Sequence, residues 1–239
     1  SRSLTRRQVA VVGATVREAA QECEMSKGLI GKKIGMTTVF GEDGTAVGVT
    51  IIEVTPNLVL AHRTADRDGY TALQLAHGEL DEKRAKRARK PDAGVYKKKN
   101  LKPHGVLKEF RVGDKELADH AVGSQITVEL FKKGDYVDVT GTTRGFGFQG
   151  VMKRHHMKGA ARDSSTAHEL HRHPGAIGQR KTPGRVFKNK RMPGQMGVDR
   201  RTVQNLPIVD VIPENNLLLV AGSIPGHKNN LVMVRPTVA

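Results

Sequence analysis

A glycine-rich stretch, RGFGFQGV at residues 144–151, fits two motifs that bind nucleotides. Gly145, Gly147 and Gly150 match the GxGxxG of a dinucleotide-binding turn, in which glycine lets the backbone approach the pyrophosphate. The first five residues also match the start of the main RNA-recognition-motif signature. The dinucleotide turn needs a covering helix after the glycines, whereas VMKRHHMKGAARDSS is short and polar. The RNA-recognition motif needs Val-x-aromatic after Phe148, but Gln-Gly-Val follows. Neither motif is favoured.

Two further patterns suggest phosphate or metal binding. GAIGQRKT at residues 175–182 nearly matches the phosphate loop GxxxxGK[ST], but Arg180 replaces the second glycine that lets backbone amides surround phosphate. His168, His171 and His173 are spaced by three and two residues, not by the four that place two ligands on one helical face. We therefore expect no catalytic residue, no metal site, no cofactor and no small-molecule substrate, and the chain is not predicted to be an enzyme.

Charge is concentrated in two segments. The formal net charge is +16. Residues 83–102 contain ten Lys/Arg and one acid, a net +9, and residues 144–201 contain fourteen Lys/Arg and three acids, a net +11. The rest of the chain is therefore mildly acidic, at −4. Segregation of this kind is typical of a protein that binds a polyanion, and it favours nucleic acid as the partner.

The second basic segment has the composition of a chain that follows RNA. Residues 174–197 contain no acid, and their prolines and glycines oppose helix formation while permitting close backbone approach. Such a segment buries too little apolar area to fold alone, so we expect RNA to order it. The expected RNA contacts are Arg144, Lys153, Arg154, His155, Lys158, Arg172, His173, Arg180, Lys181, Arg185, Lys188, Lys190 and Arg191, with Lys97, Lys98 and Lys99 from the first segment. The expected hinge or close-approach glycines are Gly145, Gly147, Gly150, Gly175, Gly178 and Gly184.

The elements that must position these side chains are predominantly strands. Short runs of β-branched and apolar residues recur from residue 28 to 80, at 106–112 and 125–131, at 136–142, where Val137 and Val139 alternate with Asp138, and again after residue 202. We expect a mostly β fold, a small closed β-barrel interrupted by a long irregular basic extension. The expected division is a leader at 1–26, the first part of the barrel at 27–82, a basic linker or helix at 83–102, the continuation of the barrel at 103–143, the extension at 144–201 and the final barrel strands at 202–239.

The first residues and the single cysteine give little information about function. Strand-like sequence follows Met25 at once, and residues 1–24 fit a presequence remnant, an extended start or a short added helix equally well. Cys23 excludes an internal disulfide and suits a reducing compartment. No apolar stretch approaches the roughly 20 residues that cross a bilayer, so no membrane partner is expected.

Several long motifs, in order along the chain, resemble one family. GLIGKKIGMTTVF, GTTRGFGFQGVMKRH, HPGAIGQRKTPGRVFKNKRMPGQMG, RRTVQNL and NLLLVAGSIPG are similar to the bacterial-type large-subunit ribosomal protein L-three, the universal third large-subunit family. The match runs from about residue 27 to 238. The chain departs from the family at residues 157–173, where it reads MKGAARDSSTAHELHRH, and residues 1–24 have no counterpart in it.

The resemblance implies a function and a set of partners. It implies a translation-protein-like barrel bound near the 3′ domain of 23S-type rRNA, which takes part early in assembly of the large subunit. It also implies an extension that reaches toward the peptidyl transferase centre, with residues 174–184 near its tip. The implied neighbours are the ribosomal proteins L-fourteen, L-nineteen and L-thirteen. Gln179 aligns with a glutamine that some bacteria N-methylate. The implied location is the ribosome, in a bacterial cytoplasm or an organelle.

Two other functions remain compatible with the residues alone. One is an RNA-modifying enzyme that uses the glycine turn for a nucleotide cofactor. The other is an RNA chaperone with a disordered basic arm.

Overall fold

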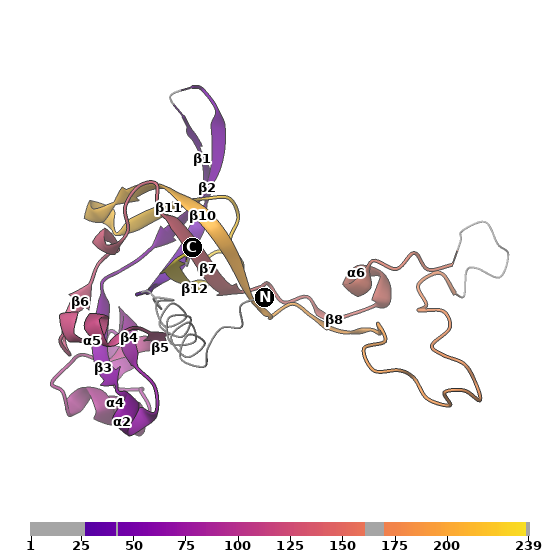
Figure 1. Ribbon diagram of the computed structural model, residues 1–239, viewed down its shortest axis with the longest axis horizontal. Helices are drawn as coiled ribbons and strands as arrows, with labels where there is room; N and C mark the ends of the chain where they lie inside the picture. The colour runs from indigo at the N-terminus through magenta and orange to yellow at the C-terminus, as the bar shows by residue number, and fades with distance from the viewer. Residues whose placement is uncertain (1–26, 42, 161–169, 238–239) are drawn as a thin grey trace, which may run out of the picture. The chain divides into compact units, whose positions relative to one another are not determined.

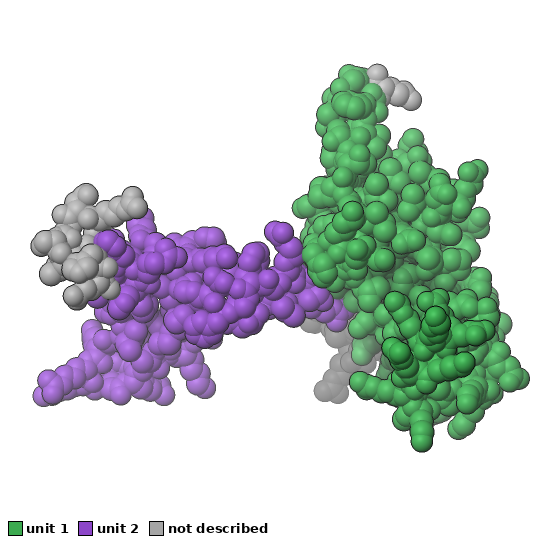
Figure 2. Space-filling view, turned by 180° about the vertical axis from the view of Figure 1, so that it is seen from behind, with its two compact units in different colours: residues 1–141, 202–239 green, residues 142–201 purple. Residues whose placement is uncertain are grey.

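The computed structural model describes residues 27–41, 43–160 and 170–237 (Figure 1). The leader predicted at residues 1–26 lies outside this part. The chain divides into two compact units, which Figure 2 colours separately: unit 1, residues 1–141 and 202–239, and unit 2, residues 142–201. The prediction of a mostly β fold is confirmed, because strands outweigh helices in the order of elements.

Six long strands of the described chain form one sheet of unit 1 in a circular order. They are β1 (Leu29–Phe40), β2 (Ala46–Glu53), β7 (Tyr136–Thr142), β10 (Arg200–Ile212), β11 (Leu217–Ala221) and β12 (Leu231–Pro236). Their order is β1-β12-β7-β10-β11-β2, and β2 pairs in turn with β1. Leu29 lies opposite Val234, and Val234 opposite Val139, in antiparallel register. This circular pairing leaves no strand without two neighbours, which is the arrangement that a barrel requires.

The remaining strands of unit 1 do not join this ring. They are β3 (Asn57–Arg63), β4 (Ala72–Glu79), β5 (His104–Arg111) and β6 (Gln125–Ile126), and they form a separate sheet in the order β5-β4-β3-β6. The sequence predicts the same residues within the barrel, at 27–82 and 103–143, whereas the structure places them in a sheet of their own. β3 and β4 form a hairpin, closed by the short helix α2 (Ala65–Asp68) and by Gly69 at a φ of 77°.

A single core joins the ring to the four-stranded sheet. Ile52 and Val139 from the ring pack in one cluster with Leu73 and Phe110 from the four-stranded sheet. Both sheets bury alternate side chains against this shared core. Alternation in a sequence shows which face of a strand is buried, but it does not show which strand lies alongside.

Short helices complete unit 1, and one of them fixes the first basic segment. The helices are α3 (Glu82–Ala85), α4 (Lys90–Lys97), α5 (Asp114–Asp119) and the 3-10 turns η1 (Val128–Leu130) and η2 (Pro213–Asn215). In α4, Tyr96 is 3% exposed and packs in a second apolar cluster with Leu58, Leu60 and Ala76. The segment at 83–102 is therefore attached to the four-stranded sheet through an aromatic anchor.

Unit 2 contains little regular structure. Its described elements are β8 (Gly147–Gln149), α6 (Val151–His155) and β9 (Gly194–Met196). β8 and β9 pair antiparallel, with Phe148 opposite Gln195. From residue 173 to 193 the chain forms no helix or strand, and Figure 1 shows it as a long irregular loop.

Candidate nucleic-acid interface

The two ends of unit 2 run side by side at its root. The Phe146 N–H donates to the Met196 carbonyl at 2.9 Å, and the Thr143 N–H donates to the Asp199 carbonyl at the same distance. Together with the β8–β9 pairing, these bonds form a short two-stranded ribbon. The ribbon fixes the residues from which the long loop departs and to which it returns.

Glycines at the root allow the two strands to approach each other. A Cβ on Gly145 would lie 2.8 Å from Val198 Cγ2, and a Cβ on Gly197 would overlap the Arg144 carbonyl oxygen. Gly197 also has a φ of +79°, which side chains rarely adopt. RGFGFQG therefore needs glycine at its start for contact between protein segments. The other glycines predicted for hinge or close approach meet no comparably tight neighbour: Gly147, Gly150, Gly175, Gly178 and Gly184.

The short helix α6 holds the returning chain. Its first residue, Val151, is buried, and Arg154 and His155 near its end both reach Met192. Arg154 Nη1 donates to the Met192 carbonyl oxygen at 2.8 Å, and His155 Nε2 donates to the same oxygen at 3.0 Å. Both residues were predicted as RNA contacts, yet the structure also gives them an intramolecular role.

The other predicted cations of unit 2 face solvent. Among the residues that the structure describes, every salt bridge lies in unit 1, and the one described acid of unit 2 is Asp199. Unpaired, exposed cations on an irregular backbone are free to bind phosphate oxygens. The exposed set is Arg144, Lys153, Lys158, Arg172, His173, Arg180, Lys181, Arg185, Lys188, Lys190 and Arg191.

The three lysines predicted in unit 1 do not have the same surroundings. Lys97 and Lys98 are exposed at the end of α4. The ammonium group of Lys99 instead donates to the Leu60 carbonyl oxygen, and partial burial together with the nearby Arg63 charge lowers its pKa. Lys99 therefore helps to hold the segment against β3, while its two neighbours remain available to a polyanion.

The nucleotide-binding motifs lack the elements that they require. The buried strand β7 does end just before the glycines of RGFGFQGV, but the helix that follows them, α6, has only five residues and is too short for a dinucleotide-binding turn. Residues 175–182 lie in the irregular loop and not between a strand and a helix. Gln179, the predicted modification site, is exposed there.

The histidines of unit 2 do not assemble a metal site in the described part. Groups of three or more His, Cys, Asp or Glu side chains that could hold a metal ion are not found among the described residues, and His168 lies outside them. His155 is engaged with Met192, as above. His171 is half-buried, and His173 is exposed.

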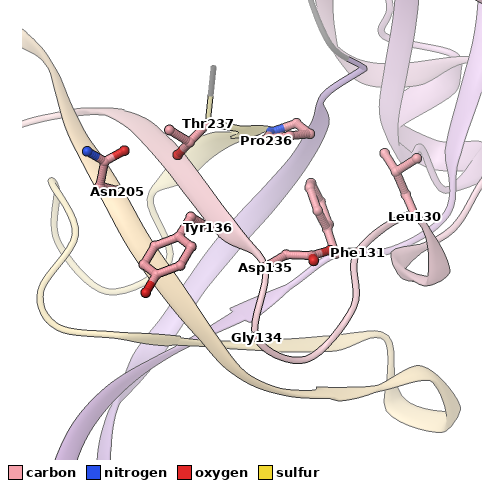
Figure 3. Close-up of a pocket in the computed structure, with 8 residues that line it drawn as sticks. All are labelled: Leu130, Phe131, Gly134, Asp135, Tyr136, Asn205, Pro236 and Thr237. Atoms are coloured by element: carbon pink, nitrogen blue, oxygen red, sulfur yellow. The ribbon is translucent and has the colours of Figure 1, made fainter. Parts of the chain in front are cut away.

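Two hollows differ in the side chains that line them. In unit 1, an open hollow of about 840 Å³ is lined by eight residues, none of them basic, and Figure 3 shows Tyr136 and Asn205 at its side. In unit 2, a smaller hollow of about 440 Å³ brings Lys158 and His173 together beside Pro174 and Gly175. The second hollow therefore joins two predicted RNA contacts that are fifteen positions apart in the sequence.

Sequence reasoning overlooked the aromatic side chains at the root. The Lys153 Nζ lies 4.7 Å from the centre of the Phe146 ring, and the Arg144 Cζ lies 5.8 Å from it. These distances are within the range of cation–π contacts. The signal in the sequence is the pair of phenylalanines that follows Arg144 in RGFGF, which the two nucleotide-binding motifs also contain.

None of the helices within the described residues has both the length and the apolar composition needed to cross a bilayer. The described part of unit 2 is irregular, poor in acidic residues and rich in exposed cations, and unit 1 is rich in strands. This combination is typical of proteins that are assembled with RNA.

Comparison with known proteins identifies the family. The family model of ribosomal protein L3 matches residues 106–217. The large ribosomal subunit protein uL3 of Anaeromyxobacter dehalogenans (strain 2CP-C) is 52% identical over 212 residues, which cover 88% of this chain and 90% of that protein. The uL3 protein of Methylobacillus flagellatus is 50% identical over 216 residues, covering 90% and 98%. The chain therefore belongs to the ribosomal protein L3 family, whose members are structural proteins of the ribosome and not enzymes.

Proposed function

We propose that this protein is a structural constituent of the large ribosomal subunit and binds its rRNA through the exposed cations of unit 2, with Lys97 and Lys98 as further contacts. The observation that carries the proposal is the set of exposed cations without ion-pair partners in the described part of unit 2. Cations that are not neutralised within a protein release the counterions of a polyanion when they bind it, which supplies affinity. The uL3 relatives are named as proteins of the large ribosomal subunit, which agrees with this partner.

The proposal has a finer form, which follows from the family. Unit 1 acts as a closed, translation-protein-like barrel near the 3′ domain of the 23S-type rRNA and nucleates assembly. Unit 2 is an arm directed toward the peptidyl transferase centre. The neighbouring proteins are L-fourteen, L-nineteen and L-thirteen, and the location is the cytoplasmic ribosome. Exposure of Gln179 makes it accessible to a methyltransferase before assembly.

A domain-selection experiment tests the proposal. The purified full chain would be titrated with equimolar transcripts of the separate domains of 23S-type rRNA at physiological salt, with transfer RNA as a polyanion control. We expect the 3′ domain to bind at least tenfold more tightly than the other transcripts, because fixed shape adds to the phosphate contacts. Equal affinity for all transcripts and for transfer RNA would contradict the proposed function and favour a non-specific RNA chaperone.

A further inference from the structure

The phenylalanines of unit 2 are all exposed, whereas two of the three in unit 1 are buried. In unit 1, Phe110 and Phe131 are buried in the core. The three phenylalanines of unit 2 are exposed: Phe146 by 41%, Phe148 by 74% and Phe187 by 63%. An exposed aromatic ring in an RNA-binding segment has the large flat face on which a base can stack.

Two of these rings belong to the most regular part of unit 2. Phe148 lies at the middle of β8, between the pairs Gly147–Met196 and Gln149–Gly194. The Phe146 N–H is bonded to the Met196 carbonyl. Both rings are thus carried on a hydrogen-bonded ribbon, so little conformational entropy is lost in holding them against a ligand.

Two cations lie beside one ring of the pair, Phe146. The side chains of Arg144 and Lys153 lie over the Phe146 ring, and both are exposed. An aromatic surface beside two cations matches a ligand that has a flat apolar face and an anionic backbone. The ligand with that chemistry is a nucleotide, and its base must be unpaired because bases in a duplex already stack on one another.

We propose that Phe148 and Phe146 form a stacking platform for an unpaired RNA base, and that Arg144 and Lys153 bind the phosphates next to that base. The inference rests on the proposed function, since it specifies the kind of RNA that the root of unit 2 binds. It adds a contact that phosphate neutralisation alone does not supply.

The test compares two RNA probes on the full chain. One is a single-stranded oligoribonucleotide that carries 2-aminopurine, and the other is a hairpin duplex of equal charge. We expect Phe148→Leu to weaken binding of the single strand by roughly 5- to 150-fold, to abolish quenching of 2-aminopurine, and to leave the duplex affinity and both salt dependences unchanged. Phe148→Trp keeps an aromatic face and should retain binding and quenching.

A matched control separates the loss of base stacking at Phe148 from a general effect of removing an exposed aromatic ring. Phe40, at the end of β1, is 72% exposed, and residues 34–52 around it contain no Lys or Arg. Phe40→Leu should therefore leave both probes unaffected.

The outcomes distinguish the two proposals. The wild type could bind both probes with a steep salt dependence while Phe148→Leu leaves both affinities unchanged. That result would overturn the stacking platform and leave the proposed function standing. An equal loss on the single strand and on the duplex would also overturn it, because the ring would then act through general packing. Failure of the wild type to bind either probe would overturn both.

Discussion

Basic residues of unit 2 differ in what their side chains contact. Arg154 is half-buried, and its guanidinium donates to the Met192 carbonyl oxygen, joining α6 to the chain that enters β9. Lys188 is exposed in the irregular loop. The first side chain acts on the protein's own backbone, and the second is free to meet a phosphate. Substitution should therefore affect the two positions in different measurements.

Arg154→Met and Lys188→Met make this difference measurable. A hydrogen bond to a charged group contributes about 1.5–3 kcal/mol, so Arg154→Met should reduce the amide exchange protection of the β8–β9 ribbon by roughly tenfold or more in the free protein. Lys188→Met should leave that protection unchanged and should lower the salt slope of RNA binding by about one. Equal protection in the two variants would mean that Arg154 is not a structural clamp.

The sequence predicted the basic character of these residues but not this division of roles. Lys97, Lys98 and Lys99 are chemically identical in the sequence, and only the packing of α4 against β3 brings the third to the Leu60 carbonyl. Likewise, Arg154 and His155 meet Met192 across a long loop. A contact between residues so far apart in the chain leaves no local pattern that a sequence argument could use.

The β8–β9 ribbon is the element from which the loop of unit 2 departs. Its strands are short, and a two-stranded ribbon of this length is marginally stable alone. Close approach at Gly145 and Gly197 and the backbone bonds at Thr143 and Phe146 extend it beyond the paired strands. The element therefore depends on backbone geometry more than on buried apolar area.

Gly197→Ala should open this ribbon. Alanine at a φ of +79° costs about 1–2 kcal/mol, and its Cβ would also meet the Arg144 carbonyl. We expect faster amide exchange at Phe146, measured by NMR on the free protein. Gly178→Ala is the matched control, because its Cβ would meet the Arg185 carbonyl oxygen at 3.7 Å, an ordinary contact. No change in exchange for Gly197→Ala would show that the ribbon does not need this close approach.

The sequence predicted where strands lie, but it did not predict which strands pair with one another in a sheet. The alternation of Val137 and Val139 with polar residues correctly predicted β7, because one face of the strand is buried. The apolar runs of β3, β4 and β5, at near-regular spacing along the chain, predicted them as barrel strands as well. Which sheet a strand joins depends on contacts between residues far apart in the sequence, and those contacts leave local alternation unchanged.

Unit 1 has a hydrophobic core, whereas the described part of unit 2 has almost none. The two apolar clusters of buried residues contain none of the described residues from 142–160 and 170–201. Unit 2 has Val151 as its buried apolar residue within the described part, against a broad core in unit 1. The stability of unit 1 should therefore be largely independent of the loop.

Replacement of residues 150–193 by Asn-Gly tests this independence. Gln149 and Gly194 lie opposite each other, so a two-residue turn can join β8 to β9. We expect the shortened protein to unfold cooperatively, within a few degrees of the full chain in calorimetry, because no side chain of the unit 1 core is removed. Loss of the cooperative transition would mean that the loop contributes to the core of unit 1.

Salt dependence of rRNA binding tests the central claim most directly. One variant would replace Lys188, Lys190 and Arg191 by Gln, and a control would replace three exposed lysines of unit 1, Lys132, Lys133 and Lys228. Both lose the same net charge. If about ten phosphates are bound, the slope of log K against log salt for the wild type should be on the order of −7 to −9, and the first variant should reduce it by about 2 to 3 while the control does not. Equal slopes for the wild type and both variants would contradict the account.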